Sequence, residues 1–277
     1  MKSTFQMDSQ NTIHRKRLLL KIIGLLFFFF IFVLSGFLIG EEQIEANLSE
    51  KNLSPSLVHL FGTDWLGRDM FMRTLKGLNL SFQVGLLASS ISAVLALTLS
   101  LLASKSRLLD YIVTILIDLF LSIPHLVALI LIAFVLGGGI KGIVVGIALT
   151  HWPTLTRVLR AEIMQIKSAE YVQLSKKLGK SRMWIVKHHF IPHLIPQLFV
   201  GFVLLFPHAI LHESAITFLG FGLSPEQPAI GIILSESMKY LSTGMWWLVL
   251  FPGISLIAMV AIFDALGNNL RKFINRE

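Results

Sequence analysis

The chain has 277 residues, of which 54% are hydrophobic and only 14% are charged, whereas soluble domains contain about 25% charged residues. It has no cysteine, which excludes disulfide frameworks and thiolate metal sites. The apolar residues fall in long blocks, the first from Leu18 to Ile39, and about 20 apolar residues in a helix cross the roughly 30 Å core of a bilayer. The sequence therefore predicts an all-α, polytopic membrane protein and excludes a soluble enzyme.

Six hydrophobic blocks predict six transmembrane helices. The first block follows a basic stretch, residues 14–17, as a secretory signal peptide would. Its apolar run, however, exceeds the roughly 7–15 residues of a signal core, and no A-x-A cleavage site follows. We therefore interpret it as an uncleaved anchor. The predicted helices are residues 18–40, 80–103, 111–136, 140–156, 198–220 and 245–267.

The distribution of basic residues predicts the orientation of these helices. With the N-terminus inside, the cytoplasmic segments hold 17 Lys and Arg residues and the outer segments hold 6, as the positive-inside rule requires. The net charge of +8 follows mostly from this topology, so no nucleic-acid partner is expected. The sequence therefore predicts a multi-pass protein of the cell membrane with both termini inside. Its predicted parts, in chain order, are a cytoplasmic tail at 1–17, a first helix at 18–40, an extracytoplasmic segment at 41–79, a five-helix core at 80–267 and a cytoplasmic tail at 268–277. The core includes a cytoplasmic loop at 157–197.

The cytoplasmic stretch at residues 168–196 is too long for a plain connector and predicts two short helices. The first runs from Glu170 to Leu178 and ends at Gly179, because glycine tolerates the left-handed conformation that closes a helix. The second runs from Met183 to Phe190 and is closed by Pro192.

The first of these short helices is amphipathic. Tyr171, Leu174 and Leu178 fall at helical spacing on one face, while Lys176 and Lys177 lie away from it. Such a helix at the cytoplasmic surface can lie on lipid headgroups or dock into a groove on a soluble partner. The residues alone do not decide between these two partners.

This stretch resembles the cytoplasmic EAA loop in the membrane subunits of ABC importers. Glu170, Gly179 and Pro192 match the acidic, glycine and proline positions of that loop, whereas Leu174 and Ser175 replace its two alanines. The resemblance implies a type I importer permease fold. It also implies that a coupling helix contacts an ATPase through Glu170, Tyr171, Leu174, Gly179 and Pro192.

Three further stretches are similar to the dipeptide, oligopeptide and nickel group of these permeases. They are HLFGTDWLGRDMFMRTLKG at 59–77, ESAITFLGFG at 213–222 and FPGISLIAMVAIFDALGNNLR at 251–271. In the last of them Asp264 stands where the group has asparagine, and Asn268 where it has aspartate.

The FGTDWLGRD stretch has two interpretations. The resemblance implies an outer element that contacts a substrate-binding protein or shields the pathway, formed by Gly62, Thr63, Asp64, Gly67, Arg68 and Asp69. Without the resemblance, the same residues describe an ordinary helix start in which Asp64 is the cap and Arg68 pairs locally with Asp69.

The chain has no GxxxxGK[ST] motif and therefore no P-loop for ATP. We expect no enzymatic activity and no cofactor in this chain. The resemblance implies that ATP and Mg are bound by two separate ATPase subunits, and that the further partners are a homologous second permease, an extracytoplasmic substrate-binding protein and membrane lipid.

Histidines at the depth of the predicted helices are the candidate cargo residues. His208 and His212 are spaced i, i+4 on one helical face, and His151 and Glu213 complete the predicted metal or translocation pathway. Imidazole suits nickel, cobalt, zinc and copper, and polar groups inside membrane helices generally face the bundle interior or a water-filled path. His125, by contrast, is expected to form an interhelical hydrogen bond.

The expected cargo is nickel or a similar divalent transition metal, free or chelated, because residues 148–160 and 208–220 resemble nickel-type permeases more than dipeptide ones. Import of di- or oligopeptides is the alternative. A stand-alone secondary carrier would leave the loop at 157–197 unexplained. An intramembrane metalloenzyme is disfavoured because the chain has no HExxH motif. Asp118 and Glu213 either pair across the bundle or line the path.

Overall fold

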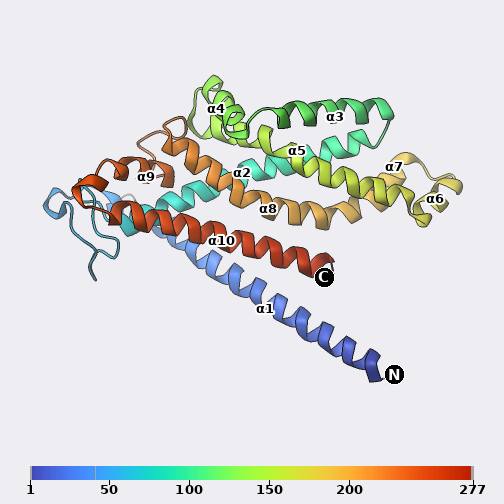
Figure 1. Ribbon diagram of the computed structural model, residues 1–277, viewed down its shortest axis with the longest axis horizontal. Helices are drawn as coiled ribbons and strands as arrows, with labels where there is room; N and C mark the ends of the chain where they lie inside the picture. Colours follow the sequence, from blue (N-terminus) through green and yellow to red (C-terminus); the bar gives the residue numbers. More distant parts are fainter. Residues whose placement is uncertain (1, 41, 276–277) are drawn as a thin grey trace. The chain divides into compact units, whose positions relative to one another are not determined.

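The computed structural model describes the backbone of residues 2–40 and 42–275, and the side chains of residues 16–27, 29–31, 33–40 and 42–274. The described residues are mostly helical (Figure 1), and their only β pairing is an isolated bridge between Thr63 and Asp69. The all-α prediction is confirmed. The chain divides into two compact units, one formed by residues 1–83 and 217–277 and the other by residues 84–216.

Five helices in the described part of the chain are long and apolar enough to cross a membrane: Lys16–Leu38, Met70–Ala103, Gly139–Ser168, Arg182–Phe218 and Trp247–Ile274. A sixth crossing arises only if helices α3 (Arg107–Ser122) and α4 (His125–Val135) are counted together, and these are bent by 96°. The span predicted at residues 111–136 is therefore this bent pair of helices rather than one continuous helix. Ile123 is extended and Pro124 follows it, because proline disfavours helical geometry in the residue before it.

The first unit contains α1 (Lys2–Leu38), the beginning of α2 (Met70–Ala103), α9 (Ile230–Met238) and α10 (Trp247–Asn275). Helices α1 and α10 lie against each other, and Phe29 meets Phe263 edge to face with ring centroids 4.5 Å apart. The Asn79 amide donates to the Val33 carbonyl at 2.9 Å, which joins α2 to α1. Helix α1 includes most of the predicted tail at 1–17, whereas residues 1 and 276–277 of the two predicted tails lie outside the described residues.

The second unit is built around α5 (Gly139–Ser168), half of whose residues are buried. Its other elements are the rest of α2, α3, α4, α6 (Glu170–Lys177), α7 (Arg182–Ile185), the π-helix η3 (Val186–Phe190) and α8 (Ile191–Phe218). The Ser92 hydroxyl on α2 donates to the Ala148 carbonyl on α5 at 2.9 Å. A Cβ at Gly201 of α8 would lie 2.4 Å from the Leu155 side chain of α5. Close helix contact therefore depends on small residues, as is typical of membrane bundles.

Helices α4 and α5 form a tight antiparallel hairpin (Figure 1). Three glycines at 137–139 make the turn with positive φ angles, which side chains with a Cβ rarely adopt. A Cβ at Gly142 would lie 2.9 Å from the Ala133 carbonyl oxygen, and one at Gly146 would lie 3.4 Å from Leu129. The absence of side chains at these two glycines therefore lets α4 lie directly on α5 and fixes their register.

Candidate functional site

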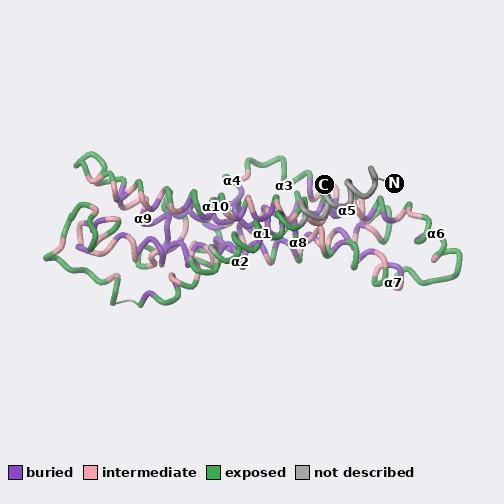
Figure 2. Tube along the Cα trace, turned by 90° about the horizontal axis from the view of Figure 1, so that it is seen from below, coloured by how far each residue is buried: buried purple, intermediate pink, exposed green. Residues whose placement is uncertain are grey.

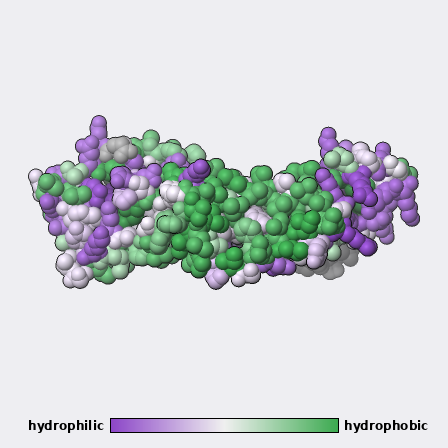
Figure 3. Space-filling view, turned by 90° about the horizontal axis from the view of Figure 1, so that it is seen from above, coloured by the Kyte–Doolittle hydropathy of each residue, from purple (hydrophilic) through white to green (hydrophobic). Residues whose placement is uncertain are grey.

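The cytoplasmic loop contains the predicted first helix, now α6. The Lys180 N–H donates to the Ser175 carbonyl at 3.1 Å, and Gly179 has φ +78°, so α6 ends in the left-handed glycine cap that the sequence predicts. Val172 is fully buried and anchors α6 to the core of the second unit. The remaining loop surface is hydrophilic or exposed around α6 and α7 (Figures 2 and 3).

The apolar face of α6 is exposed to solvent. Tyr171, Leu174 and Leu178 keep 50%, 58% and 70% of their surface accessible. Ser175, also on α6, contacts the rest of the loop: its hydroxyl lies 2.9 Å from His189 Nε2. This contact helps to hold α6 in place. The face is therefore held in position while its apolar side chains remain exposed, as in a surface that binds a partner.

The prediction that a second helix at Met183–Phe190 is closed by Pro192 is wrong. Helix α7, η3 and α8 continue into one another, so that Arg182–Phe218 is a single long helix. The Ile191 N–H donates to the Val186 carbonyl five residues back. Because η3 already departs from the α-helical ladder, the missing N–H of Pro192 falls where the helix is widened, and the helix runs on.

A cavity of about 770 Å³ lies behind the loop, between the end of α2, the start of α3, and α5 to α7. Its charged lining residues are Lys105, Arg107, Asp110, Arg160, Lys167, Lys176, Lys180 and Arg182. Lys167 donates to the Ser104 carbonyl at 2.9 Å and Arg182 to the Lys105 carbonyl at 3.2 Å. These cations bind carbonyls at the end of α2, which a helix terminus leaves unsatisfied, and so tie the loop to the membrane helices.

The outer element is held by a buried ion-pair network. Asp64 is fully buried, and its Oδ2 accepts from Arg68 Nε and from Arg73 Nη1 at 2.7 Å each. Arg73 also reaches Glu236 of α9 at 3.1 Å. The local pairing of Arg68 with Asp69 is therefore wrong, because Asp64 and Glu236 engage Arg68 instead.

The cap of α2 is Asp69 rather than Asp64. Asp69 Oδ1 accepts from the N–H groups of Phe71 and Met72 at 2.9 and 3.0 Å, which satisfies two free donors at the start of the helix. Its other oxygen lies 2.8 Å from His59 Nδ1. Asp64 Oδ1 instead accepts from backbone N–H groups in the preceding turn. Most polar groups of the outer element therefore have partners within the element.

Two glycines of the outer element stand where the backbone folds tightly on itself. Gly62 and Gly67 have φ +71° and +77°. A Cβ at Gly62 would lie 2.5 Å from the Leu53 carbonyl oxygen, and one at Gly67 would lie 1.7 Å from that of Asn47. Glycine is therefore required at both positions by conformation and by space.

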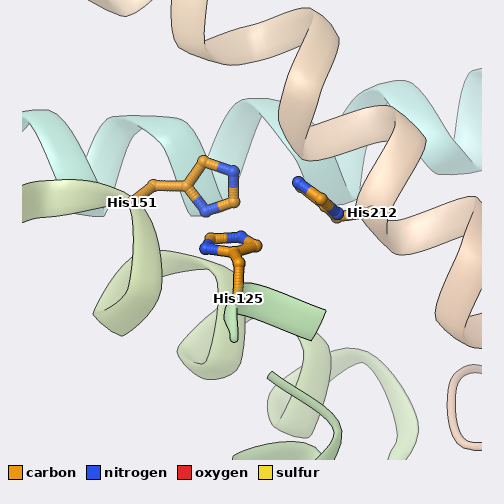
Figure 4. Close-up of side chains that lie close together, drawn as sticks. All are labelled: His125, His151 and His212. Carbon is orange, nitrogen blue, oxygen red and sulfur yellow. The ribbon is translucent and has the colours of Figure 1, made fainter. Parts of the chain in front are cut away.

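Three histidines from separate helices of the second unit point toward one another (Figure 4). They are His125 at the start of α4, His151 in α5 and His212 in α8, and one ligand nitrogen from each lies within 4.8 Å of the others. The ring centroids of His125 lie 4.5 Å from those of both His151 and His212. We call these three residues the histidine cluster.

The sequence pattern places His151 and His212 in this cluster but misses His125. The register of the α4–α5 hairpin explains its position, since four residues before Leu129 is His125 and four residues after Gly146 is Thr150, the neighbour of His151. The signal was present in the sequence, as a proline break followed by a histidine and a triple-glycine turn. It becomes informative only once the two helices are known to be paired.

The other pathway candidates are not members of the histidine cluster. His208 is exposed and does not belong to the histidine cluster, although it precedes His212 by one turn. Glu213 is fully buried, and the Ser214 hydroxyl donates to its carboxylate at 3.2 Å. Asp118 of α3 pairs with Arg157 of α5 at 2.7 Å, so it pairs across the bundle.

Comparison with known proteins agrees with this architecture. Residues 85–276 match the family described as binding-protein-dependent transport system inner membrane component. The chain belongs to this family. It is thus an ABC importer permease of the inner membrane, and the predicted membership of the ABC importer permeases is confirmed.

Two relatives of this permease are named dipeptide transport system permease protein DppC. One is from Bacillus subtilis, with 30% identity over 97% of this chain and 84% of its own. The other is from Alkalihalophilus pseudofirmus, with 32% identity over 91% of this chain and 84% of its own. A solved structure titled as inward-facing MetNI methionine ABC transporter matches 74% of this chain and 97% of its own with a TM-score of 0.57 and 16% identity, a likeness of fold alone.

Proposed function

We propose that this permease forms part of the membrane pathway of an ATP-driven importer of short peptides. The peptide cargo is supported by two relatives that align with nearly the whole chain and are named dipeptide permeases. The proposed complex contains a homologous second permease, two ATPase subunits that bind ATP and Mg, and an extracytoplasmic substrate-binding protein. Peptides are thereby preferred over the metal cargo that the sequence favours.

Helix α6 supplies the proposed contact with the ATPase. Its exposed face of Tyr171, Leu174 and Leu178 suits a groove on a soluble partner. Helix α5 ends immediately before α6, and the long helix beginning at Arg182 follows it. Movement of α6 would therefore be transmitted along two continuous helices, both of which run deep into the second unit.

Uptake of a radiolabelled dipeptide tests this proposal. We expect a strain without this gene to lose uptake, and the restored gene to return it. A Lys-to-Ala substitution in the P-loop of the partner ATPase should abolish uptake while the permease remains in the membrane. Unchanged dipeptide and tripeptide uptake in the deletion strain would contradict the peptide cargo.

Nickel or a similar divalent metal, free or chelated, is a second candidate cargo, and the histidine cluster favours it. Imidazole nitrogens are suitable ligands for such ions. Chelators built from amines and carboxylates also share functional groups with short peptides, so one pathway can suit both. Uptake of trace nickel, with and without spent culture medium as a chelator source, separates this cargo from peptides: gene-dependent nickel uptake supports it, and gene-independent uptake contradicts it.

A further inference from the structure

We propose that His125, His151 and His212 together bind one divalent transition-metal ion, such as Ni²⁺ or Zn²⁺, and leave a coordination position open for a donor atom of a chelator. The inference deepens the second cargo candidate and rests on it for the role of the ion as cargo. The three ligands come from α4, α5 and α8, and all lie within the second unit.

The hydrogen bonding of His151 leaves its metal-binding nitrogen available. Nδ1 of His151 lies 3.0 Å from the Ile147 carbonyl oxygen. Because a carbonyl oxygen only accepts, Nδ1 carries the hydrogen, and Nε2 of the neutral ring keeps its lone pair. Histidines that ligate metals characteristically donate their other ring N–H to a carbonyl or carboxylate in this way. His151 is therefore oriented as a metal ligand before any ion arrives.

Two ring nitrogens of the histidine cluster are buried without a hydrogen-bond partner among the described residues. They are Nε2 of His125 and Nε2 of His151. Buried polar atoms are generally satisfied, because leaving them unpaired is costly. One metal ion between the rings would satisfy both nitrogens and the ligand nitrogen of His212.

The spacing of the rings is compatible with one ion between them. Tetrahedral zinc with bonds of about 2.1 Å places its ligands roughly 3.4 Å apart, whereas the cluster nitrogens lie within 4.8 Å of one another. A movement of about 0.8 Å or less by each ring would therefore suffice to close the cluster on the ion. Conduction requires binding that is weak enough for release.

The charge balance favours a chelated ion over a free one. The three imidazoles are neutral ligands, and none of the cluster residues is acidic. An ion coordinated by them alone would keep its full double charge within the helix bundle, where charge is costly. A chelator built from amine and carboxylate groups would bind the ion at its open coordination position. Its carboxylates would supply the missing negative charge.

Metal binding to the whole importer in lipid nanodiscs tests the site. The complex should carry a tag without histidine, and Ni²⁺ or Zn²⁺ bound after equilibrium dialysis is counted per copy of this chain. We expect one cluster-dependent ion in the wild type, and at least tenfold weaker binding in His151→Ala and His212→Ala. X-ray absorption of the bound ion should show imidazole nitrogen neighbours.

Matched histidine variants separate the cluster from general affinity for metals. His193→Ala and His188→Ala remove loop histidines, and His208→Ala removes the one-turn neighbour of His212; all three should bind like the wild type. His125→Gln keeps a polar side chain at the helix start and should also lose the ion. It therefore tests the cluster even if His151→Ala fails to assemble. Equal binding by the wild type and the cluster variants, or equal loss in His193→Ala, would overturn the proposal.

Binding and transport can fail separately. If the purified importer holds the ion at the cluster but cells take up only peptides, the site stands and the metal cargo is wrong. If gene-dependent nickel uptake is unchanged in a cluster variant that assembles, the cargo stands and the site is wrong.

Discussion

The outer element and the α6 loop are both short stretches of chain, but they differ in whether their side chains are buried and paired or exposed. In the outer element, Asp64 and Arg73 are almost fully buried and bind each other, and Asp69 caps α2. In the loop, by contrast, Tyr171 and Leu174 lie exposed on a helix that ends in an open glycine turn. The side chains of the outer element stabilise the element itself, whereas the exposed side chains of α6 are available to contact a partner.

This difference shows how to tell a stabilising motif from a binding surface. Both stretches match motifs of importer permeases, so the motif alone does not distinguish their roles. Where nearly all polar groups are satisfied internally, substitution should cost folding free energy. Where apolar side chains are exposed on a fixed helix, substitution should cost function while the chain remains folded. The apparent free energy of unfolding in detergent measures the first kind of cost, and uptake measures the second.

Asp64→Ala should have the largest effect. It leaves Arg73, whose side chain is 4% exposed, with Glu236 as its remaining acidic partner, and breaking a buried ion pair costs about 3–5 kcal/mol. We expect a strong fall in thermal stability and in the amount of protein in the membrane. Asp64→Asn retains an oxygen for the N–H groups of Leu66 and Arg68, so its smaller loss would isolate the contribution of charge. Wild-type stability in both variants would contradict the ion-pair network.

Gly67→Ala should destabilise more than Gly179→Ala, although the two glycines have nearly the same φ, +77° and +78°. A methyl group at Gly67 would meet the Asn47 carbonyl oxygen at 1.7 Å, whereas nothing lies within 4 Å of the same group at Gly179. We expect about 2–4 kcal/mol for the first, from strain and overpacking, and about 1 kcal/mol for the second, from strain alone. Thermal melts of both variants in detergent measure the difference, and equal losses would contradict the close approach at Gly67.

The fold was predictable from the sequence wherever one helix could be recognised by itself. Composition and block length identify the membrane helices, and Gly179 marks the end of α6. Two departures from the predicted helices involve proline. Pro124 breaks a span that hydropathy joins, whereas Pro192 fails to end a helix that local rules would close. What a proline does depends on whether neighbouring turns can absorb its missing N–H, and single-sequence patterns do not contain that information.

The candidate site was predictable only in part, for a related reason. The i, i+4 spacing of His208 and His212 suggests a shared ion, but spacing within one helix does not say which face meets other helices. The structure turns His212 toward His125 and His151 and leaves His208 exposed. Recognising His125 requires the antiparallel register of α4 on α5, which glycines at close contacts create. A site shared by three helices is a tertiary property.

Asp118→Ala should have a much smaller effect than Asp64→Ala, although each removes a carboxylate that accepts from an arginine at 2.7 Å. The side chains of Asp118 and Arg157 are 60% and 55% uncovered by the rest of this chain, and an ion pair that water reaches contributes about 0.2–1 kcal/mol. If water reaches this pair, raising the salt concentration should erase its contribution, while the buried pair should be less sensitive. A loss comparable with that of Asp64→Ala would mean that Asp118 is covered in the assembled importer.

Leu174→Asp should change folding least, by about 0.5 kcal/mol or less, because its side chain is exposed. Its effect should appear in transport instead. An apolar anchor at the centre of an interface contributes about 2 kcal/mol or more, so uptake and copurification of the ATPase should fall at least tenfold.

Leu57→Asp, at a position 97% exposed in the outer segment, is the matched control for an added charge and should transport normally. If Leu174→Asp also transports normally with the ATPase still bound, the exposed face of α6 does not form the ATPase contact. Binding of an α6 peptide to anionic liposomes would then test lipid headgroups as its partner. If instead Leu174→Asp unfolds the chain, the face is a structural surface and its contrast with the outer element disappears. Unchanged stability with lost coupling is the result that distinguishes a binding helix from a stabilising one.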